Sequence, residues 1–253
     1  MFAEERHREI VRRARESGRV DVATLSAELD VTPETVRRDL TSLERAGLVR
    51  RVHGGAIPIE RLGFEPAVAA RETVLTAEKA RIGKAALAEL PKDGAIIVDA
   101  GTTTRQFLEQ LPTDVELMVV VNSPPLATLL ARWSNVTVML LGGRVRGRTL
   151  AAVGEWTTAA LAGIHADVAF MATNGISVER GLTTPDLTEA GAKRAMMAAA
   201  RRTVLLADHT KIGNDYFARF GQLADVDTFI TDSGADTELL DEISDAGPRV
   251  VLA

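Results

Sequence analysis

Apolar residues near the N-terminus recur with the spacing of amphipathic helices. The pattern predicts a first helix over residues 4–16 and a second over residues 22–29, which Asp21 would cap. A third helix begins after Thr32 and ends before Gly47, because hydroxyl residues commonly cap helix starts and glycine commonly follows helix ends. The N-terminal part of the chain is therefore expected to form a small helical domain.

The third predicted helix has one apolar stripe and one polar face. Val36, Leu40 and Leu43 form the stripe, since they are spaced by four and then three residues. At about 100° per residue, the opposite face carries Glu34, Thr35, Arg37, Arg38 and Thr41. In an isolated helix such a face is most often a solvated surface, but adjacent arginines also suit the major groove of DNA, where arginine pairs with guanine.

A basic hairpin follows this helix. Residues 48–57 contain β-forming side chains and basic residues around Gly54 and Gly55, which predict the turn. Two helices joined by a tight turn are typical of a helix-turn-helix domain, and a basic hairpin after them is typical of its winged form. For His53, an ordinary surface position is as consistent as a phosphate contact. The candidate DNA-binding residues are Thr32, Glu34, Thr35, Arg37, Arg38, Thr41, Arg50, Arg51 and His53.

From about residue 76 the pattern changes to apolar strands alternating with amphipathic helices. Runs such as AIIVDA, VELMVVVN and TVLLAD are typical of strands buried on both faces of a sheet. The expected fold class is therefore α/β, with a winged helix-turn-helix domain over 1–57 and a mostly parallel sheet over 76–253. Residues 58–75 have mixed polarity and no sustained period, so they are expected to form a linker that includes the start of a helix.

Composition and charge narrow the classes of function. The chain has no cysteine, which excludes disulfide scaffolds, thiolate zinc sites and cysteine nucleophiles. The net charge of −5 argues against a nucleic-acid-binding surface over the whole chain. Residues 1–57, however, contain 11 arginines against 10 acidic residues, so the basic charge is concentrated in one small part. The charged N-terminus and the lack of a long apolar segment predict a soluble cytoplasmic protein without a membrane partner.

Polar residues follow several of the predicted strands, where ligands of parallel sheets commonly bind. The segment DAGTTT combines a glycine, which permits close backbone approach, with three hydroxyl side chains and a helix start. This combination suits a phosphate group, although Thr102 or Thr103 could equally serve as a simple helix cap. The candidate residues in this segment are Asp99, Gly101, Thr102, Thr103 and Thr104.

Further candidate residues lie at the same expected edge of the sheet. They are Asn122, Asn174, Gly175, Gly181, Lys193, Asp208 and Lys211. The segments at 174–175 and 180–184 could be ordinary loops or could bind sugar hydroxyls. Glu189 and Lys193 are spaced as an i, i+4 pair, which is more often a surface ion pair. Together these groups could bind a small phosphorylated polyol, with carboxylates and asparagines on the hydroxyls and lysines on the phosphate.

Two long motifs resemble a known family. The string TVRRDLTSLERAGLVRRVHGGA resembles the N-terminal domain of the DeoR family of bacterial transcriptional regulators. The resemblance implies that Thr35, Arg37, Arg38 and Asp39 belong to the recognition helix, with Arg50, Arg51 and His53 in the wing. The helical projection places Asp39 near the edge of the core, where it would orient an arginine or cap locally rather than contact DNA.

The second half resembles the effector domain of the same family. That domain is similar in fold to ribose-5-phosphate isomerase and binds phosphorylated sugars. The resemblance implies an effector site made by the matching positions, which are Asp99, Gly101, Thr102, Thr103, Asn174, Gly175, Gly181, Lys193, Asp208 and Lys211. The strings LLGGRVRGRTLAAVGEW and TNGISVERGLTTPDLTEAGAKRAMM further resemble those of fructose-operon repressors. The resemblance therefore implies a fructose phosphate as the effector.

Three classes of function are compatible with these patterns. The first is a repressor of a sugar-utilisation operon, with double-stranded operator DNA, a phosphorylated sugar and further copies of itself, as a dimer or tetramer, as partners. The second is an isomerase-like enzyme carrying a DNA-binding module, which would need Asp99, Glu189 or Asp208 as its base. Residues 174–178 lack the acids of the Asp-Gly-Ala-Asp-Glu type of loop found in such isomerases. The third is an adaptor without DNA binding, which the arginines of the helix and hairpin disfavour. No catalytic residue, cofactor or metal is expected, since the histidines lack metal-ligand spacing.

Overall fold

A computed structural model describes residues 3–45, 48–52, 54–58, 65 and 67–253 of the chain. The side chains of Glu4 and Arg15 are not among the described parts. The chain divides into two compact units, Met1–Pro66 and Ala67–Ala253, and the division falls inside the expected linker over 58–75. Gly47 and His53, for which a helix end and a DNA contact are expected, lie outside the described residues.

The first unit is a winged helix-turn-helix domain, which confirms the prediction. Its elements are α1 (Ala3–Ser17), β1 (Val20–Asp21), α2 (Val22–Glu28), α3 (Pro33–Arg45), β2 (Val49–Val52) and β3 (Gly55–Pro58). The three strands form an antiparallel sheet in the order β1-β3-β2. The expected apolar stripe of Val36, Leu40 and Leu43 is buried in a core shared with α1 and α2.

Two local expectations in this unit were wrong. Asp21 occupies the N-cap position of α2, but its side chain makes no capping hydrogen bond and instead accepts from Arg19 Nε at 3.2 Å. Of the two glycines expected in the turn, Gly54 lies there with a positive φ of 73°, whereas Gly55 pairs with Val52 in the sheet. A Cβ atom at position 55 would lie 2.0 Å from the carbonyl oxygen of Val20, so the close pairing of β1 with β3 requires glycine there.

A buried ion pair joins α1 to α3. Asp39 is 6% exposed and accepts hydrogen bonds from Arg6 Nε at 2.5 Å and Arg6 Nη2 at 3.0 Å. His7 Nε2 lies 2.9 Å from the same carboxylate. Asp39 therefore positions the third helix and does not face solvent with Arg37 and Arg38.

The second unit contains a seven-stranded sheet with helices on both faces. Its helices are α4 (Val68–Glu72), α5 (Thr76–Ala86), α6 (Thr102–Leu108), α7 (Pro124–Leu130), α8 (Glu155–Ala162), α9 (Leu187–Ala198) and α10 (Thr237–Asp245), with short 3-10 turns at Leu87–Glu89, His209–Lys211 and Leu223–Asp225. The strands of the sheet are β4 (Gly94–Val98), β5 (Leu117–Val121), β6 (Val136–Leu140), β9 (Ala166–Met171), β12 (Ala200–Leu206), β14 (Thr228–Thr231) and β15 (Arg249–Leu252).

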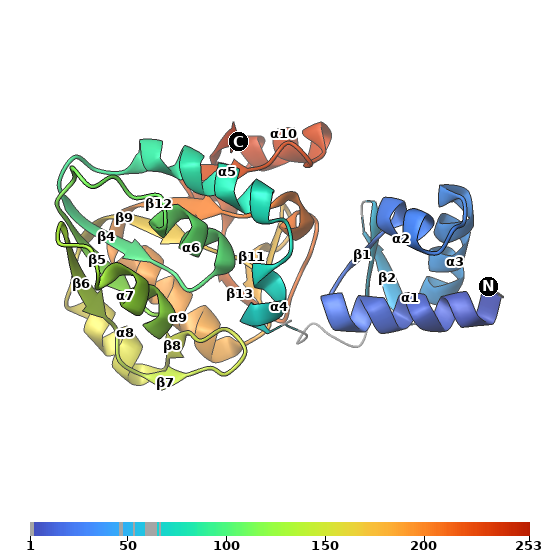
Figure 1. The fold of residues 1–253 in the computed structure, drawn as a ribbon, viewed down its shortest axis with the longest axis horizontal. Coiled ribbons are helices and arrows are strands. Elements are labelled where there is room, and N and C mark those ends of the chain that lie inside the picture. The colour runs from blue at the N-terminus through green and yellow to red at the C-terminus, as the bar shows by residue number, and fades with distance from the viewer. Residues whose placement is uncertain (1–2, 46–47, 53, 59–64, 66) are drawn as a thin grey trace. The chain divides into compact units, whose positions relative to one another are not determined.

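All neighbouring strands of this sheet are parallel, in the order β15-β14-β12-β9-β4-β5-β6. Ile96 and Val98 of β4 pack with α5, α6 and α7, whereas Ile97 packs in the cluster that includes α8, α9 and α10. Successive residues of a strand thus point to opposite faces of the sheet and are buried in different hydrophobic clusters. Both sets of residues are therefore apolar, which explains the continuously apolar strands. The prediction of an α/β domain with a mostly parallel sheet is confirmed (Figure 1).

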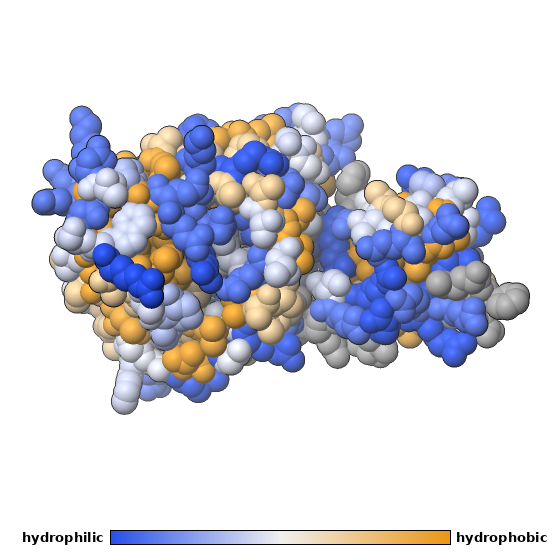
Figure 2. Space-filling view, in the orientation of Figure 1, coloured by the Kyte–Doolittle hydropathy of each residue, from blue (hydrophilic) through white to orange (hydrophobic). Residues whose placement is uncertain are grey.

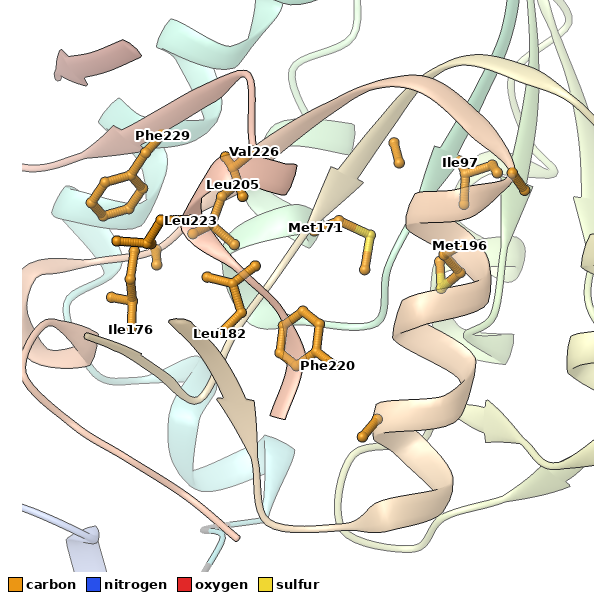
Figure 3. Packing of buried hydrophobic residues seen from close by; sticks show 14 of the residues in the cluster. Ile97, Met171, Ile176, Leu182, Met196, Leu205, Phe220, Leu223, Val226 and Phe229 are labelled. Atoms are coloured by element: carbon orange, nitrogen blue, oxygen red, sulfur yellow. The ribbon is translucent and has the colours of Figure 1, made fainter. Parts of the chain in front are cut away.

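Two small antiparallel sheets were not expected from the sequence. One contains β10 (Gly175–Ser177), β11 (Gly181–Thr184) and β13 (Ala218–Gly221), and the other is the hairpin of β7 (Arg144–Val145) and β8 (Ala152–Val153). Leu182 and Phe220 of the first sheet belong to the same buried cluster as Met171 and Met196, as Figure 3 shows. This sheet therefore extends the core on the α9 side.

The surface view in Figure 2 is mostly hydrophilic, with hydrophobic residues in separate patches. Within the described residues, every helix is too short or too polar to cross a membrane.

Replacement of Asp39 by asparagine is expected to destabilise the first unit. Removing one partner of a buried ion pair leaves an uncompensated charge, so the free energy of unfolding should fall by about 3 kcal/mol. Amide hydrogen exchange at Leu40 in the full chain measures this change. The control is Glu16→Gln, which breaks the exposed pair with Arg12 and should cost less than about 0.5 kcal/mol. Equal effects of the two substitutions would contradict the structural role of Asp39.

The same ion pair predicts a pH dependence. Burial by itself raises the pKa of Asp39, but the hydrogen bonds from Arg6 and His7 outweigh burial and hold the pKa below its ordinary value of 3.8. A carboxyl group with a lowered folded-state pKa stabilises the fold above its unfolded pKa, and this contribution is lost as pH falls through the folded pKa. The stability difference between wild type and Asp39→Asn should therefore shrink below pH 3.8.

Candidate functional site

The third helix exposes two arginines beside a set of hydroxyl groups. Thr32 caps α3, since Thr35 N donates to Thr32 Oγ1 at 3.2 Å. Arg37 and Arg38 are exposed, and Arg37 lies only 3.6 Å from the carboxylate of Glu34 in an exposed pair. This face is therefore both open and basic, as an interface with a nucleic acid requires.

The hairpin places further basic groups next to this helix. Arg50 and Arg51 of β2 are exposed. Arg51 donates from its backbone N to Glu44 Oε1 at 2.8 Å and from Nη1 to Thr41 Oγ1 at 3.2 Å. These bonds fix the hairpin against the C-terminal half of α3. Thr41 also donates to the carbonyl of Arg37, so its hydroxyl is committed to contacts within the unit.

In the second unit, polar groups from two strands and one helix meet at the carboxyl edge of the sheet. Lys193 of α9 forms an ion pair with Asp99, which follows β4, and donates to Ala172 O at 3.0 Å. Asn122, which follows β5, donates to Asp99 at 3.4 Å and accepts from Ala100 N at 2.8 Å. Their side chains are almost completely buried. The structure thus brings together three predicted site residues from distant parts of the sequence.

A second ion pair continues this cluster. Glu189 lies 3.8 Å from Lys193, and both side chains are 2–3% exposed, so the i, i+4 pair is buried and not a surface pair. Arg146, in the loop between β7 and β8, is paired with Glu189 and lies 3.5 Å from Asp186. Thr149 donates to Glu189 Oε2 at 3.1 Å. Charges of opposite sign therefore alternate from Asp99 through Lys193 and Glu189 to Arg146.

Thr102, Thr103 and Thr104, which follow Gly101, differ in their contacts. Gly101 occupies the N-cap position of α6, so neither Thr102 nor Thr103 is the cap. A Cβ atom at position 101 would lie 3.0 Å from both Ala172 Cβ and Thr104 Oγ1. Thr104 is fully buried, and its hydroxyl lies within hydrogen-bond distance of the carbonyls of Asp99 and Gly101. Thr103 is also buried, whereas Thr102 reaches a pocket.

This pocket has a volume of about 200 Å³ and a polar lining. It is lined by Glu72, Thr76, Lys79, Thr102, Arg105, Gln106 and Glu109. Lys79 is 4% exposed, and burial lowers the pKa of its ammonium group to about 8. Arg105 is paired with Glu72 at 2.9 Å and with Glu109 at 2.8 Å. Two cations, two carboxylates and two hydroxyl-bearing side chains thus face one small space.

Asp208 lies after β12, close enough to Lys79 and Lys211 for their charges to affect it. Burial by itself raises the pKa of Asp208, but the charge of Lys211, the hydroxyl of Thr210 and the charge of Lys79 outweigh burial and lower it. Asp208 therefore stays ionised between two cations. Lys211 lies in the 3-10 turn that follows, and its side chain is partly exposed.

Three other predicted site residues have structural roles in this unit. Asn174 accepts from Thr184 Oγ1 at 3.0 Å, which ties the end of β9 to β11. A Cβ atom at Gly175 would lie 2.2 Å from Asn214 O, and one at Gly181 would lie 2.5 Å from Gly221 O. Both glycines therefore permit close packing of the small sheet, whatever they contribute to a ligand.

Sequence profiles identify both units. A DeoR-like helix-turn-helix domain matches residues 6–61, and the DeoR C terminal sensor domain matches residues 75–233. The chain belongs to the DeoR family. The prediction from the two sequence motifs is therefore confirmed, and the two matches together cover most of this DeoR-family regulator.

Curated relatives agree with this assignment. The HTH-type transcriptional regulator GlpR of Haloferax volcanii is 39% identical over 99% of this chain and 98% of its own length. The uncharacterized HTH-type transcriptional regulator FruR of Bacillus subtilis is 32% identical over 92% of each chain. The glycerol-3-phosphate regulon repressor of Escherichia coli is 27% identical over 95% of each chain. These relatives are named as regulators, so this DeoR-family chain is a transcriptional regulator and not an enzyme.

Among solved structures, ribose 5-phosphate isomerase A from Neisseria gonorrhoeae aligns with a TM-score of 0.38 and 18% identity, over 53% of this chain and 52% of that chain. A likeness at this level supports no further conclusion about the DeoR-family sensor domain.

Sequence reasoning missed several residues of the site, of which Arg146 and Lys79 make the most contacts with its charged groups and with the backbone near it. Arg146 follows β6 within GGRVRGR, so the rule that polar residues after parallel strands converge could have found it. Lys79 lies inside a helix, and its ammonium group donates to the backbone carbonyls of Arg71 and Val74 at 2.6 and 2.5 Å. No side-chain pattern in the sequence indicates such a contact.

Replacement of Lys193 by methionine is expected to destabilise the sensor domain. The change leaves Asp99 and Glu189 as buried carboxylates without their central cation, so the free energy of unfolding should fall by about 3–5 kcal/mol. Urea unfolding followed by tryptophan fluorescence measures it, since both tryptophans lie in this unit.

The matched control for this prediction is Lys84→Met, which changes an exposed lysine of α5 and should cost less than about 0.5 kcal/mol. In addition, Asp99→Asn combined with Lys193→Met should cost less than the sum of the single changes, because the two residues share one interaction. Strict additivity would show that the pair makes no stabilising contact.

Proposed function

We propose that this regulator represses a sugar-utilisation operon and that a small phosphorylated sugar controls its binding to operator DNA. The proposal rests on one observation: a buried charge cluster and a polar pocket lie at the same edge of the sensor domain. A buried cluster of alternating charges lies after β4 and β5, and a cation-lined pocket lies at the start of α6. Asp99 and Thr102 connect the two, since they are only three positions apart in the sequence.

The two parts suit the two ends of a phosphorylated polyol. Carboxylates such as Asp99 and Glu189 accept hydrogen bonds from sugar hydroxyls, and Asn122 can both donate and accept. Lys79 and Arg105 can bind a phosphate, with the hydroxyls of Thr76 and Thr102 as further donors. A relative named as a glycerol-3-phosphate regulon repressor supports a phosphorylated ligand of this size. A fructose phosphate is the first compound to test.

The N-terminal unit supplies the DNA-binding half of the proposal. Arg37, Arg38, Arg50 and Arg51 are exposed on α3 and β2. The described residues contain one helix-turn-helix unit, so we propose that two or four copies bind a repeated operator, with recognition helices roughly 34 Å apart or a multiple of that distance. Thr32, Glu34 and Thr35 lie at the start of α3, where they would help to set the position of the helix on the duplex.

Arg38→Ala is expected to weaken operator binding without unfolding the chain. Loss of one arginine contact should cost about 1–3 kcal/mol of binding free energy, and loss of a phosphate contact should also reduce the salt dependence by about one unit. Binding to a duplex selected by the wild type from a random pool measures both quantities. Arg132→Ala, an exposed arginine of the sensor domain, is the control. Unchanged binding of Arg38→Ala would remove this residue from the interface.

The effector class is tested by thermal unfolding with fructose 1-phosphate, fructose 6-phosphate, ribose 5-phosphate and glycerol 3-phosphate. A compound at about 100 times its dissociation constant should stabilise the sensor domain by about 2.7 kcal/mol. Thr102→Val keeps the size of the side chain but removes its hydroxyl, so it should lose most of this stabilisation. Thr128→Val, on α7 and outside the pocket lining, is the control. If no compound stabilises the wild type, the assignment of a phosphorylated sugar is wrong.

A further inference from the structure

The short helix α4 is the first element of the sensor domain after the DNA-binding unit in the chain. It spans only Val68–Glu72 and has no fully buried residue, unlike α5, α6 and α7. Its position is therefore fixed mainly by polar contacts and not by a hydrophobic core. An element held in this way can change position without disrupting the core of the domain.

At its N-terminal end, α4 is bound to the loop that carries Arg146. Val68 N donates to the carbonyl oxygen of Arg148 at 2.7 Å. Within the same loop, Arg146 and Thr149 both bind Glu189 of the buried charge cluster. The loop is narrow, because Leu150 N donates to Arg146 O at 2.7 Å and Leu150 has a positive φ of 56°. One compact loop thus contacts the charge cluster with its side chains and α4 with its backbone.

At its C-terminal end, α4 is bound to the cation-lined pocket. Glu72 is paired with Arg105 at 2.9 Å, and both residues line the pocket. Lys79, also in the lining, donates to the carbonyl of Arg71 in the last turn of α4 and to that of Val74 just after the helix. Arg71 Nε is buried and has no hydrogen-bond partner among the described residues. An anion bound beside Lys79 could supply that partner.

A ligand bound at the charge cluster or in the pocket would therefore replace a contact that holds α4 in place. A hydroxyl that binds the Glu189 carboxylate competes with Arg146 or Thr149, both of which belong to the loop that holds Val68. A phosphate in the pocket competes with Glu72 for Arg105 and with the two carbonyls for Lys79. Both competitions exchange a contact of α4, or of the loop bound to it, for a contact to the ligand.

We infer that α4 is the output element of the sensor domain, which converts occupancy of the effector site into a change at the attachment point of the DNA-binding unit. The inference rests on the proposed function for the class of ligand. The route itself, from Glu189 through the Arg146 loop to Val68 and from Arg105 through Glu72, rests on the contacts of this chain alone. If α4 has two positions that differ in operator affinity, a substitution that favours one of them alters operator affinity even when no ligand is bound.

Val68→Pro is the sharpest test of this route. Val68 is the first helical residue, where proline is tolerated, and Ala67 has a ψ of 150°, which suits a residue before proline. The substitution removes the N–H that binds Arg148 and leaves the helix intact. Val68→Ala is the matched control, because it shortens the side chain and keeps the N–H.

Operator binding of the full chain is measured with and without each sugar phosphate named above, using the duplex selected by the wild type. Val68→Pro should change ligand-free operator affinity by about fivefold or more relative to Val68→Ala. It should also reduce the effect of the active compound on operator affinity to about twofold or less, while thermal stabilisation by that compound persists. Glu72→Gln should act in the same direction, and Glu242→Gln, on the exposed surface of α10, should behave as wild type.

The outcomes separate this inference from the proposed function. If the wild type responds to a compound and Val68→Pro responds equally, α4 is not the output element although the effector assignment stands. If no compound affects the wild type, the effector assignment fails. The ratio of the ligand-free operator affinities of Val68→Pro and Val68→Ala still shows whether α4 influences DNA binding. A ratio near one together with unchanged amide exchange over residues 69–75 overturns the inference.

Discussion

The sensor domain depends on the burial of opposite charges along the carboxyl edge of its sheet. Asp99 and Lys193 have side chains only 1–2% exposed, and each would cost several kcal/mol to bury without a partner. Their partners come from β4, β5, β9 and α9, so a shifted strand or helix would leave a charge unpaired. The pairing therefore selects one arrangement of these elements.

The DNA-binding unit uses a charge on its recognition helix in a similar way. Asp39 points inward to Arg6 and His7, while Arg37 and Arg38, two and one positions earlier, are exposed to solvent. Neighbouring charged residues on one helix thus serve different purposes, because a rotation of about 100° per residue separates their directions. The inward carboxylate fixes the orientation in which the outward arginines are presented.

Local periodicity explains what the sequence could predict. The apolar runs of β4 and β5 and the stripe of Val36, Leu40 and Leu43 are patterns over a few residues, and the convergence of Asp99 and Asn122 follows from parallel strands. The place of Arg146 after β6 is visible in the sequence, but its pairing with Glu189 depends on the path of a loop and joins residues 43 positions apart. The small antiparallel sheet was missed because its strands contain glycines and threonines and only three or four residues each.

The two units have separate hydrophobic interiors. The cluster around Leu25 and Leu40 contains only residues of the first unit, and the clusters around Ile97 and Phe107 contain only residues of the second. A core substitution in one unit therefore leaves the packing inside the other unchanged. In evolution, recombination between residues 66 and 67 could exchange one half of the gene while the other half kept its sequence, so that descendants acquire new combinations of DNA site and signal without redesigning either interior.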